Sequence, residues 1–412
     1  MYTCEVMTKK KHILMLLESS FPPDIRVEKE INTLTKNSFT VSILCYRKNK
    51  HKTKHIFNNA TVLNYISQSY FQRIKAKLSM LFTFIHPNFL AEMKLFYDQK
   101  PFDMIHVHDL PLSKTALTFQ KYHPKIKVIL DFHENYPEAL LVWNEWNKGL
   151  KTCINKYIFH RYKRWLHYEK KVIAQADHVI AVVKEMKERL INIHNVSENQ
   201  ISIVSNTEPK SFDQLPIDQT IMNTYKNDFI ISYIGGFGPH RGIDTAILGM
   251  SKLKQNIPIK LLLIGKGNHD IESKFKSLIK SNHLSEHVLI LGWQPFEKVS
   301  SYIAASNICI VPHKNNPHTA NTVPHKLFQY MMKGKPVLVS SCAPLKRIVE
   351  ETQSGLVFEA DNPRDFAKKV MLFFDNPKLL QQSSENGKLA TSKNIYNWQH
   401  DAHNLLKVYK MQ

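Results

Sequence analysis

Short apolar runs alternate with longer amphipathic stretches through the first half of the chain. The runs are flanked by turn residues and lie at His12–Leu17, Thr40–Cys45, Met104–Val107, Lys127–Leu130 and His178–Val182. Uninterrupted apolar runs of this kind are typical of strands that are buried on both faces of a parallel sheet. The amphipathic stretches between them predict the helices that cover such a sheet.

The same pattern starts again in the second half of the chain. Its apolar runs are Phe229–Ile234, Lys260–Ile264, His287–Leu291, Ile308–Val311 and Pro336–Ser340. A chain of 412 residues, 43% of them hydrophobic, is also too long for one compact core. The sequence therefore predicts an α/β protein with two Rossmann-like doubly wound domains.

The polar segment that begins at Ser205-Asn206-Thr207-Glu208-Pro209 separates the two series of runs. We place the domain boundary there, with an N-terminal domain over residues 1–208 and a C-terminal domain over residues 209–395. A last helical stretch, about 396–412, remains after the second sheet closes. It can pack back on the first domain.

The charge of the chain indicates an anionic partner. Its 56 Lys and Arg residues outnumber its 35 Asp and Glu residues, which gives a formal charge of +21. Nucleic acid, an acidic membrane face and phosphorylated substrates all fit that charge. The sequence contains no recognised nucleic-acid module, so we expect no nucleic-acid partner.

Two basic, aromatic-rich stretches in the first half bear on the membrane alternative. Residues 151–171 show helical spacing of aromatic residues between lysines, and Arg73–Lys77 runs into the mostly apolar Leu78–Ile85. Helices of this composition bind anionic membrane surfaces, although a core-facing helix with a basic outer side gives the same pattern. No run of 18 uncharged apolar residues occurs, which predicts a soluble or peripheral protein.

The cysteines and the N-terminus indicate the compartment. Five scattered cysteines without a C-x-x-C pair argue against a disulfide framework. The run Ile13–Leu17 is too short for a signal peptide and is better explained as a first strand. We expect a cytoplasmic protein that is peripheral at the inner face of the cytoplasmic membrane.

The segment from Asn315 to Leu338 predicts a loop, a helix, a turn and a strand. Pro324 suits a first helical turn and Gly334 the position just past a helix end, so the helix is expected to present its N-terminus at Thr322 and Val323. Free backbone N–H groups and the positive end of the helix dipole bind diphosphates. Lys326 adds a positive charge one turn into the helix.

Two glycine clusters follow strands of the second domain. The first is Gly235-Gly236-Phe237-Gly238-Pro239-His240-Arg241-Gly242, in which Arg241 offers a cation for a phosphate. The second, Ile264-Gly265-Lys266-Gly267, ends the next strand at the edge where doubly wound sheets bind ligands. A dinucleotide fold is an alternative, but the G-x-G-x-x-G spacing and the acidic residue at the end of the following strand are missing.

With these segments the chain resembles family 4 of the retaining GT-B glycosyltransferases, especially members from bacterial surface-polysaccharide pathways. The resemblance covers nearly the whole chain. Its segments are Phe21–Glu30, Asp103–Asp109, Asp131–Glu134, Ala176–Ala181, Gly235–Asp244 and, as the strongest, Pro324–Val337.

The resemblance implies that the second domain binds a nucleotide-sugar donor. Arg241 is similar to the family's phosphate-binding cation, with Lys266 as a second one, beside Gly235 and Gly236. Thr322 and Val323 resemble the family's diphosphate cradle. The family carries two glutamates separated by seven residues, which contact the donor hexose and the ribose. Those positions are Asn321 and Gln329 here, and amides keep the hydrogen bonds but lose the negative charge.

In the first domain, His133 matches the family histidine that positions the donor hexose and stabilises its oxocarbenium-like transition state. Asp24, Arg26, His108 and Asp109 are expected on the acceptor side of the cleft. A metal site at His106, His108 and Asp109 is a weaker alternative. Since fixed cations neutralise the leaving diphosphate and the chain has no D-x-D pair, we expect no metal and no cofactor besides the donor.

The sequence thus predicts a retaining hexosyltransferase that uses a UDP- or GDP-linked sugar and a lipid-linked or membrane-associated saccharide acceptor, in surface-polysaccharide or lipopolysaccharide synthesis. Two alternatives remain. A nucleotide-sugar 2-epimerase would use the same diphosphate loops, and a non-catalytic nucleotide-sugar-binding protein would explain the amides at Asn321 and Gln329.

Overall fold

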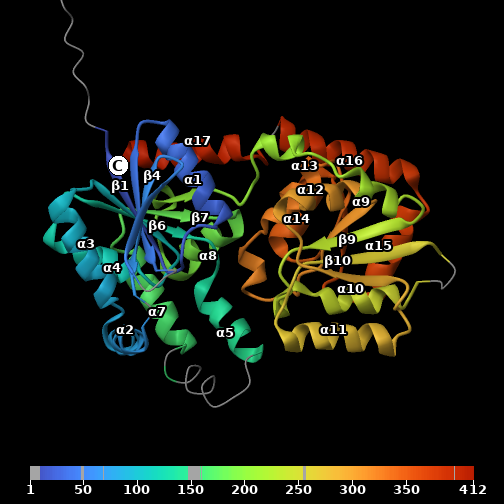
Figure 1. The fold of residues 1–412 in the computed structure, drawn as a ribbon, viewed down its shortest axis with the longest axis horizontal. Coiled ribbons are helices and arrows are strands. Elements are labelled where there is room, and N and C mark those ends of the chain that lie inside the picture. The colour runs from blue at the N-terminus through green and yellow to red at the C-terminus, as the bar shows by residue number, and fades with distance from the viewer. Residues whose placement is uncertain are drawn as a thin grey trace, which may run out of the picture. The chain divides into compact units, whose positions relative to one another are not determined.

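The structure is a computed structural model that describes residues 10–47, 51–67, 69–146, 158, 160–253, 257–393 and 395–412 (Figure 1). The chain forms two compact units. The first consists of Met1–Val182, Met186–Val204 and Ala402–Gln412, and the second of Val183–Glu185 and Ser205–Asp401. The chain therefore leaves the first unit slightly before the expected residue 208 and returns to it slightly after the expected residue 396.

The first unit contains an eight-stranded sheet in the order β3-β4-β2-β1-β5-β6-β7-β8. Its strands are β1 (His12–Leu17), β2 (Thr40–Tyr46), β3 (Thr53–Phe57), β4 (Ala60–Ile66), β5 (Met104–His108), β6 (Lys127–Phe132), β7 (His178–Ala181) and β8 (Ile201–Ile203). The helices are α1 (Ile25–Lys36), α2 (Tyr70–Thr83), α3 (Pro87–Gln99), α4 (Ser113–Tyr122), α5 (Tyr136–Trp146), α7 (Tyr162–Ile173) and α8 (Lys184–His194).

The edge strands of this sheet, β3 with its neighbour β4 on one side and β8 on the other, were not predicted. Strands β3 and β4 pair antiparallel and are joined at Asn58 and Asn59, whose φ angles are 47° and 65°. Asparagine tolerates this left-handed region better than other residues with a side chain. Strand β3 is mostly exposed, as an edge strand can be, so it lacks the apolar run by which the central strands are found.

The second unit contains six parallel strands in the order β11-β10-β9-β12-β13-β14. They are β9 (Phe229–Ile234), β10 (Ile259–Ile264), β11 (Val288–Gly292), β12 (Ile308–Val311), β13 (Val337–Ser340) and β14 (Gly355–Phe358). The helices are α9 (Gln219–Thr224), α10 (Ile243–Met250), α11 (His269–Ser281), α12 (Phe296–Ala305), α13 (His325–Met332), α14 (Ala343–Thr352), α15 (Pro363–Phe374) and α16 (Pro377–Ser392).

Helices cover both faces of the second sheet, with α10 and α11 on one side and α12 and α13 on the other (Figure 1). The central strands β9 and β12 are buried almost throughout. Both units are thus doubly wound α/β structures, and the predicted fold class is confirmed.

The last helix, α17 (Trp398–Met411), begins in the second unit and ends in the first. Leu405, Val408 and Tyr409 are fully buried. The Tyr409 hydroxyl forms a short hydrogen bond with Nδ1 of His106, and the Tyr409 ring lies 5.6 Å from that of Phe39. The end of the chain is therefore part of the core of the first unit.

The two stretches with membrane character differ in the structure. In α7, Trp165, Tyr168 and Val172 are buried, so this described part of residues 151–171 is a core-facing helix. Residues 151–157 and 159 lie outside the described residues. In α2, by contrast, only Ala76 is buried. Within the part of the chain that the structure describes, none of the helices has the length and apolar character to cross a bilayer.

Candidate functional site

Two glycine loops meet at the carboxyl edge of the second sheet. Gly235 follows β9 and Gly265 follows β10, with φ angles of 132° and 150°. The backbone N–H of Gly235 donates to Ile264, and that of Phe237 donates to Lys266, at 2.8 and 2.9 Å. A Cβ atom at residue 265 would lie 1.9 Å from the carbonyl oxygen of Gly235. Only glycine permits this close approach of the two loops.

Lys326 lies against the first of these loops. Its side chain is 9% exposed, and its Nζ lies 3.6 Å from the centre of the Tyr233 ring. A Cβ atom at residue 235 would come within 2.6 Å of Nζ, so glycine at that position makes room for the ammonium group. No described residue accepts a hydrogen bond from Nζ. Burial, followed by repulsion from Arg241, lowers the pKa of Lys326 well below its usual value.

Arg241 lies beside histidines, and among the described residues no carboxylate forms an ion pair with it. Its Nη1 lies 3.0 Å from Nε2 of His313, and the rings of His240 and His318 pack beside it at 5.1 Å from each other. Burial and the nearby Arg241 lower the pKa of His240 to about 2 and that of His313 well below its usual value. His240 and His313 therefore bring no charge that would balance Arg241 or a protonated Lys326.

The helix that was predicted to cradle the diphosphate begins later than expected. Helix α13 starts at His325 with Pro324 as its N-cap, and a 3₁₀ turn, Thr319–Asn321, precedes it. Thr322 and Val323 are consequently not the first residues of the helix, which corrects the prediction. The carbonyl oxygen of Val323 instead accepts a hydrogen bond of 3.0 Å from Nδ2 of Asn206. The helix dipole still ends beside Lys326, in the first turn.

The two amides of the glutamate motif have partners within the second unit. Nδ2 of Asn321 donates to the carbonyl oxygen of Pro317 at 2.7 Å and so holds the preceding loop. Nε2 of Gln329 donates to Oε1 of Glu208 at 3.0 Å, and His325 lies 3.3 Å from the same oxygen. A carboxylate is therefore present beside position 329, but it comes from the linker. Sequence reasoning missed Glu208 because it lies 121 residues away from Gln329.

Of the remaining predicted donor residues, Gly236 lies at an open point of the loop, since a Cβ atom there would meet nothing within 4 Å. Lys266 is exposed, and its carbonyl oxygen joins the two glycine loops. Gly236 and Lys266 thus lie on the exposed side of the two glycine loops. Lys326 is buried and packs against the first of these loops.

In the first unit, a buried ion-pair network joins α1 to the ends of β5 and β6. Arg26 donates to both carboxylate oxygens of Asp131, at 2.7 and 3.0 Å, and to the carbonyl oxygen of Val204 at 3.0 Å. The Nε of Arg26 also lies 3.1 Å from Oε1 of Glu30. Burial opposes the ionisation of Asp131, but Arg26 and His133 outweigh it and hold its pKa well below the usual value.

His133 lies between two carboxylates at the end of β6. Its Nε2 donates to Asp131 at 2.9 Å, its backbone N–H donates to Asp109 at 3.0 Å, and its Nδ1 lies 3.6 Å from Asp109. Burial lowers the pKa of His133, but Asp109 and Asp131 raise it to about 9. The imidazole is therefore charged at neutral pH. A charged imidazole donates hydrogen bonds, and its positive charge does not stabilise a developing oxocarbenium ion, so that part of the prediction is not carried forward.

The residues predicted on the acceptor side have structural roles in the first unit. Asp24 is the N-cap of α1 and accepts from the backbone N–H groups of Arg26 and Val27. Arg26 is 3% exposed and His108 is 1% exposed. Because both side chains are buried beside Asp131, direct acceptor contact by Arg26 and His108 is not carried forward. Asp109, 30% exposed, fixes the backbone of His133, and acceptor contact by Asp24 and Asp109 stays a prediction.

A group of possible metal ligands lies in this network, formed by Glu30, His106, His108 and Asp131, whose ligand atoms lie within 4.8 Å of one another. The guanidinium group of Arg26 already lies against both carboxylates. A divalent ion would have to displace it at the cost of a buried, uncompensated charge. We therefore interpret the group as part of the ion-pair network.

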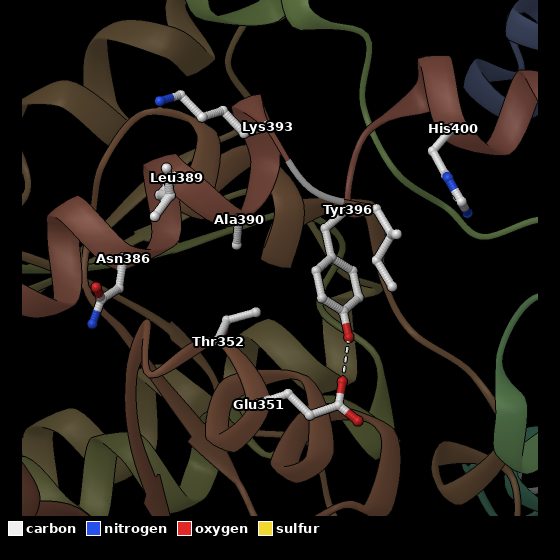
Figure 2. A pocket seen from close by; sticks show the side chains of 9 residues that line it. Glu351, Thr352, Asn386, Leu389, Ala390, Lys393, Tyr396 and His400 are labelled. Carbon is white, nitrogen blue, oxygen red and sulfur yellow. Dashed lines mark hydrogen bonds between the residues drawn. The ribbon is translucent and has the colours of Figure 1, made fainter.

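A separate depression of about 620 Å³ lies in the second unit between α14 and α16 and near the start of α17 (Figure 2). Figure 2 shows the Tyr396 hydroxyl hydrogen-bonded to Glu351. Glu351 also forms an ion pair of 3.2 Å with Arg347. Neither glycine loop contributes to its lining, and neither do Arg241 and Lys326. The depression is thus distinct from the cation site.

Two doubly wound units, one with glycine loops around uncompensated cations, are the architecture of the GT-B nucleotide-sugar transferases. Comparison with family models makes the class specific. Residues 217–390 match the model "Glycosyl transferases group 1", and residues 26–207 match the model "Glycosyltransferase Family 4". The two models together cover most of the chain, which belongs to the group 1, family 4 glycosyltransferases of the GT-B fold.

Individual relatives are distant. The chain is 28% identical over 178 residues, 43% of its length and 47% of the relative's, to an uncharacterized glycosyltransferase of Methanocaldococcus jannaschii. It is 21% identical over 328 residues, 73% of its length and 65% of the relative's, to chitobiosyldiphosphodolichol beta-mannosyltransferase of Debaryomyces hansenii. The matches to three uncharacterized glycosyltransferases of Methanocaldococcus jannaschii cover 47% to 60% of the length of those relatives.

Among solved structures, HepE of Anabaena in complex with UDP superposes with a TM-score of 0.73 at 12% identity, over 98% of this chain and all of that one. At this identity the comparison shows the shared fold.

The pair formed by Gln329 and Glu208 allows a charge-swap test. Gln329→Glu would place two buried carboxylates about 3.0 Å apart, and we expect it to lower the free energy of unfolding by about 2–3 kcal/mol. Glu208→Gln combined with Gln329→Glu restores one carboxylate and one amide, and should recover most of that loss. Denaturant unfolding of the three variants measures both effects. A double variant no more stable than Gln329→Glu contradicts the pairing.

Lys326 is expected to lower the stability of the unliganded protein, because a buried cation without a partner is unfavourable. The depressed pKa means that this cost grows as the pH falls from the usual lysine pKa. Lys326→Met should therefore raise the free energy of unfolding at neutral pH by on the order of 1 kcal/mol, and the unfolding midpoint with it. The same substitution should abolish stabilisation by UDP. Thermal unfolding with and without UDP tests both. A destabilised variant that retains the UDP response contradicts this account.

His133 should stabilise the first unit in a pH-dependent manner. Its folded pKa of about 9 exceeds the ordinary value of 6.5, so its contribution is complete below that value and is lost as the pH rises through about 9. The difference in unfolding midpoint between the wild type and His133→Gln should accordingly shrink by several degrees over this range. Thermal unfolding across the pH series measures the difference. A constant difference would mean that His133 is not charged in the folded state.

Proposed function

We propose that the chain is a retaining, metal-independent glycosyltransferase that transfers a hexose from a UDP- or GDP-linked sugar to a lipid-linked or membrane-associated saccharide. The second unit binds the donor and the first unit binds the acceptor. The observation that carries this proposal is that the basic groups of Arg241 and Lys326 lie beside glycine loops with no carboxylate partner among the described residues, in a chain of this family.

The chemistry of transfer explains that charge. When the bond between the anomeric carbon and the diphosphate breaks, negative charge develops on the leaving nucleoside diphosphate. Cations that are fixed in place before the reaction stabilise that charge without reorganisation. Arg241 can contact phosphate oxygens in a forked geometry, and Lys326 acts as a buried point charge. Such a site needs no metal ion to neutralise the leaving group.

We assign the contacts with the donor sugar and the ribose to the two amide side chains. Asn321 and Gln329 occupy the positions that the family resemblance assigns to donor contacts, and Glu208 adds the carboxylate beside Gln329. Hydrogen bonding to sugar hydroxyls therefore remains available, with a carboxylate supplied from a different segment. The retaining stereochemistry is what the family resemblance implies.

The acceptor class rests on charge and on one relative. The excess of 21 positive charges suits a phosphorylated or membrane-borne acceptor. The name of the Debaryomyces relative describes a mannosyltransferase that acts on a dolichol diphosphate-linked saccharide. We infer that the protein works at the cytoplasmic face of a membrane, in the synthesis of a surface polysaccharide or lipopolysaccharide.

The donor site is tested by thermal shift with a panel of nucleotide sugars on wild type and Arg241→Ala. A donor at about 100 times its dissociation constant should stabilise the wild type by about 2.7 kcal/mol, and Arg241→Ala should lose most of that stabilisation. Lys276→Ala, at an exposed position of α11, serves as the control. Equal shifts in both proteins would contradict the assigned site.

The reaction type is tested by incubating the bound nucleotide sugar without and with an acceptor extract. Release of the nucleoside diphosphate should depend on the acceptor. Formation of an epimer without acceptor would instead identify a nucleotide-sugar 2-epimerase. Donor binding with neither product would identify a binding protein of the same fold.

A further inference from the structure

A cavity of about 840 Å³ lies within the first unit, beside the end of β1. All residues that line it belong to this unit. Glu18, which directly follows β1, is one of them, and so are Tyr46 at the end of β2 and His86 at the N-cap of α3. Since β1 and β2 are parallel neighbours, Glu18 and Tyr46 lie together at the carboxyl edge of the sheet. Doubly wound sheets bind their ligands at this edge.

A chain of hydrogen bonds ends at the carboxylate of Glu18. Nδ1 of His86 accepts from the backbone N–H of Phe89 at 3.4 Å, so the proton of the neutral imidazole is on Nε2. Burial lowers the pKa of His86 to about 4, which keeps the ring neutral at pH 7. Nε2 therefore donates to the Tyr46 hydroxyl at 3.3 Å, and that hydroxyl donates to Oε1 of Glu18 at 3.5 Å. The chain orients Glu18 as an acceptor.

The lining of the cavity offers a ligand both a hydrogen-bond acceptor and a hydrogen-bond donor. Among the described residues, Tyr46 alone donates to the Glu18 carboxylate, although a carboxylate can accept about four hydrogen bonds. Asn88 lines the same cavity, and none of the described residues accepts a hydrogen bond from its buried Nδ2. Hydroxyl groups both donate and accept hydrogen bonds, so a ligand with several hydroxyl groups suits this pair.

The remaining lining favours a neutral ligand with apolar faces. The carboxylate of Glu18 repels an anion, whereas Arg73 and Lys77 of α2, which also line the cavity, repel a cation. The rings of Tyr136 and Trp165, whose centres are 4.9 Å apart, belong to the lining as well. The C–H faces of a pyranose ring pack against aromatic rings, while its hydroxyl groups reach the polar side chains around them.

We propose that this cavity binds a neutral sugar ring of the acceptor, and that Glu18 accepts a hydrogen bond from one of the hydroxyl groups of that sugar. Tyr46 is a positioning residue, because its hydroxyl orients the carboxylate of Glu18. Glu18 thereby selects acceptors that carry a hydroxyl group at the matching ring position. The inference rests on the proposed function, since it gives one sugar of the acceptor a place in the first unit.

The test is an NMR titration of the full chain, without donor, with the methyl glycosides of glucose, galactose, mannose and N-acetylglucosamine at millimolar concentration. At least one glycoside should bind the wild type. Glu18→Gln should weaken its binding about 10-fold, because a hydrogen bond to a charged group is lost. Tyr46→Phe should weaken it about 3-fold, since the carboxylate is then no longer oriented.

Monodeoxy analogues of the bound glycoside identify the hydroxyl group that Glu18 contacts. One analogue should bind the wild type about 10-fold more weakly than the parent glycoside does. Glu18→Gln should not weaken the binding of that analogue further, because the hydroxyl group in question is already missing. An equal loss of affinity for every analogue in Glu18→Gln contradicts a direct contact. The analogues test the wild type as well, so the answer does not depend on the variant alone.

Two controls separate this site from general effects of charge. Asp98→Asn removes a carboxylate at an exposed position of α3 that does not line the cavity, and it should bind the glycoside as the wild type does. Inorganic phosphate in millimolar excess should not displace the glycoside. The unfolding midpoints of Glu18→Gln and Tyr46→Phe should stay close to that of the wild type, which shows that the loss of binding is local.

The outcomes distinguish this inference from the proposed function. The inference is overturned if the wild type binds no glycoside, if Glu18→Gln binds it unchanged, or if inorganic phosphate displaces it. Transfer from the nucleotide sugar to an acceptor would in each of these cases leave the proposed function standing. Absence of a thermal shift with nucleotide sugars in the wild type overturns the proposed function itself, whether or not a glycoside binds.

Discussion

The second unit contains two basic side chains with which none of its described carboxylates pairs. Lys326 is buried against the Tyr233 ring, where no described residue accepts a hydrogen bond from its Nζ, and Arg241 is paired with a neutral imidazole. A folded protein rarely keeps buried cations in this state unless a ligand completes the site. The positive-φ glycine at residue 235, the contact between the two glycine loops and the dipole of α13 all act at this point. These features together make the two glycine loops a site that suits an anion.

In the first unit, by contrast, the buried charged groups are paired with one another. Asp131 is held by Arg26 and His133, and the three groups satisfy one another in the core. His133 is therefore held in place and kept charged by Asp109 and Asp131. Because the network also joins α1 to β6 and to Val204, substitutions in it alter both the geometry of His133 and the stability of the unit.

The pattern of apolar residues and glycines along the chain predicted those features that depend on local sequence. The buried parallel strands, the glycine loops and Lys326 could be found because apolar runs, glycine clusters and the segment before Gly334 are visible along the chain. The pairing of Arg26 with Asp131 and of Gln329 with Glu208 could not, since each joins residues more than 100 positions apart. The start of α13 was placed too early because Pro324 fits both the N-cap and the first turn. Strand β3 was missed because an exposed edge strand has no apolar pattern.

The central claim, that a nucleoside diphosphate completes the cation site, is tested most directly by calorimetric titration of UDP into the wild type, Arg241→Ala and Lys326→Met. None of the described residues accepts a hydrogen bond from Nζ of Lys326, and Arg241 is paired with an imidazole, so phosphate oxygens are the partners that the site lacks. The account predicts tight binding to the wild type that each substitution weakens about 10-fold or more. Unchanged affinity in either variant would contradict it.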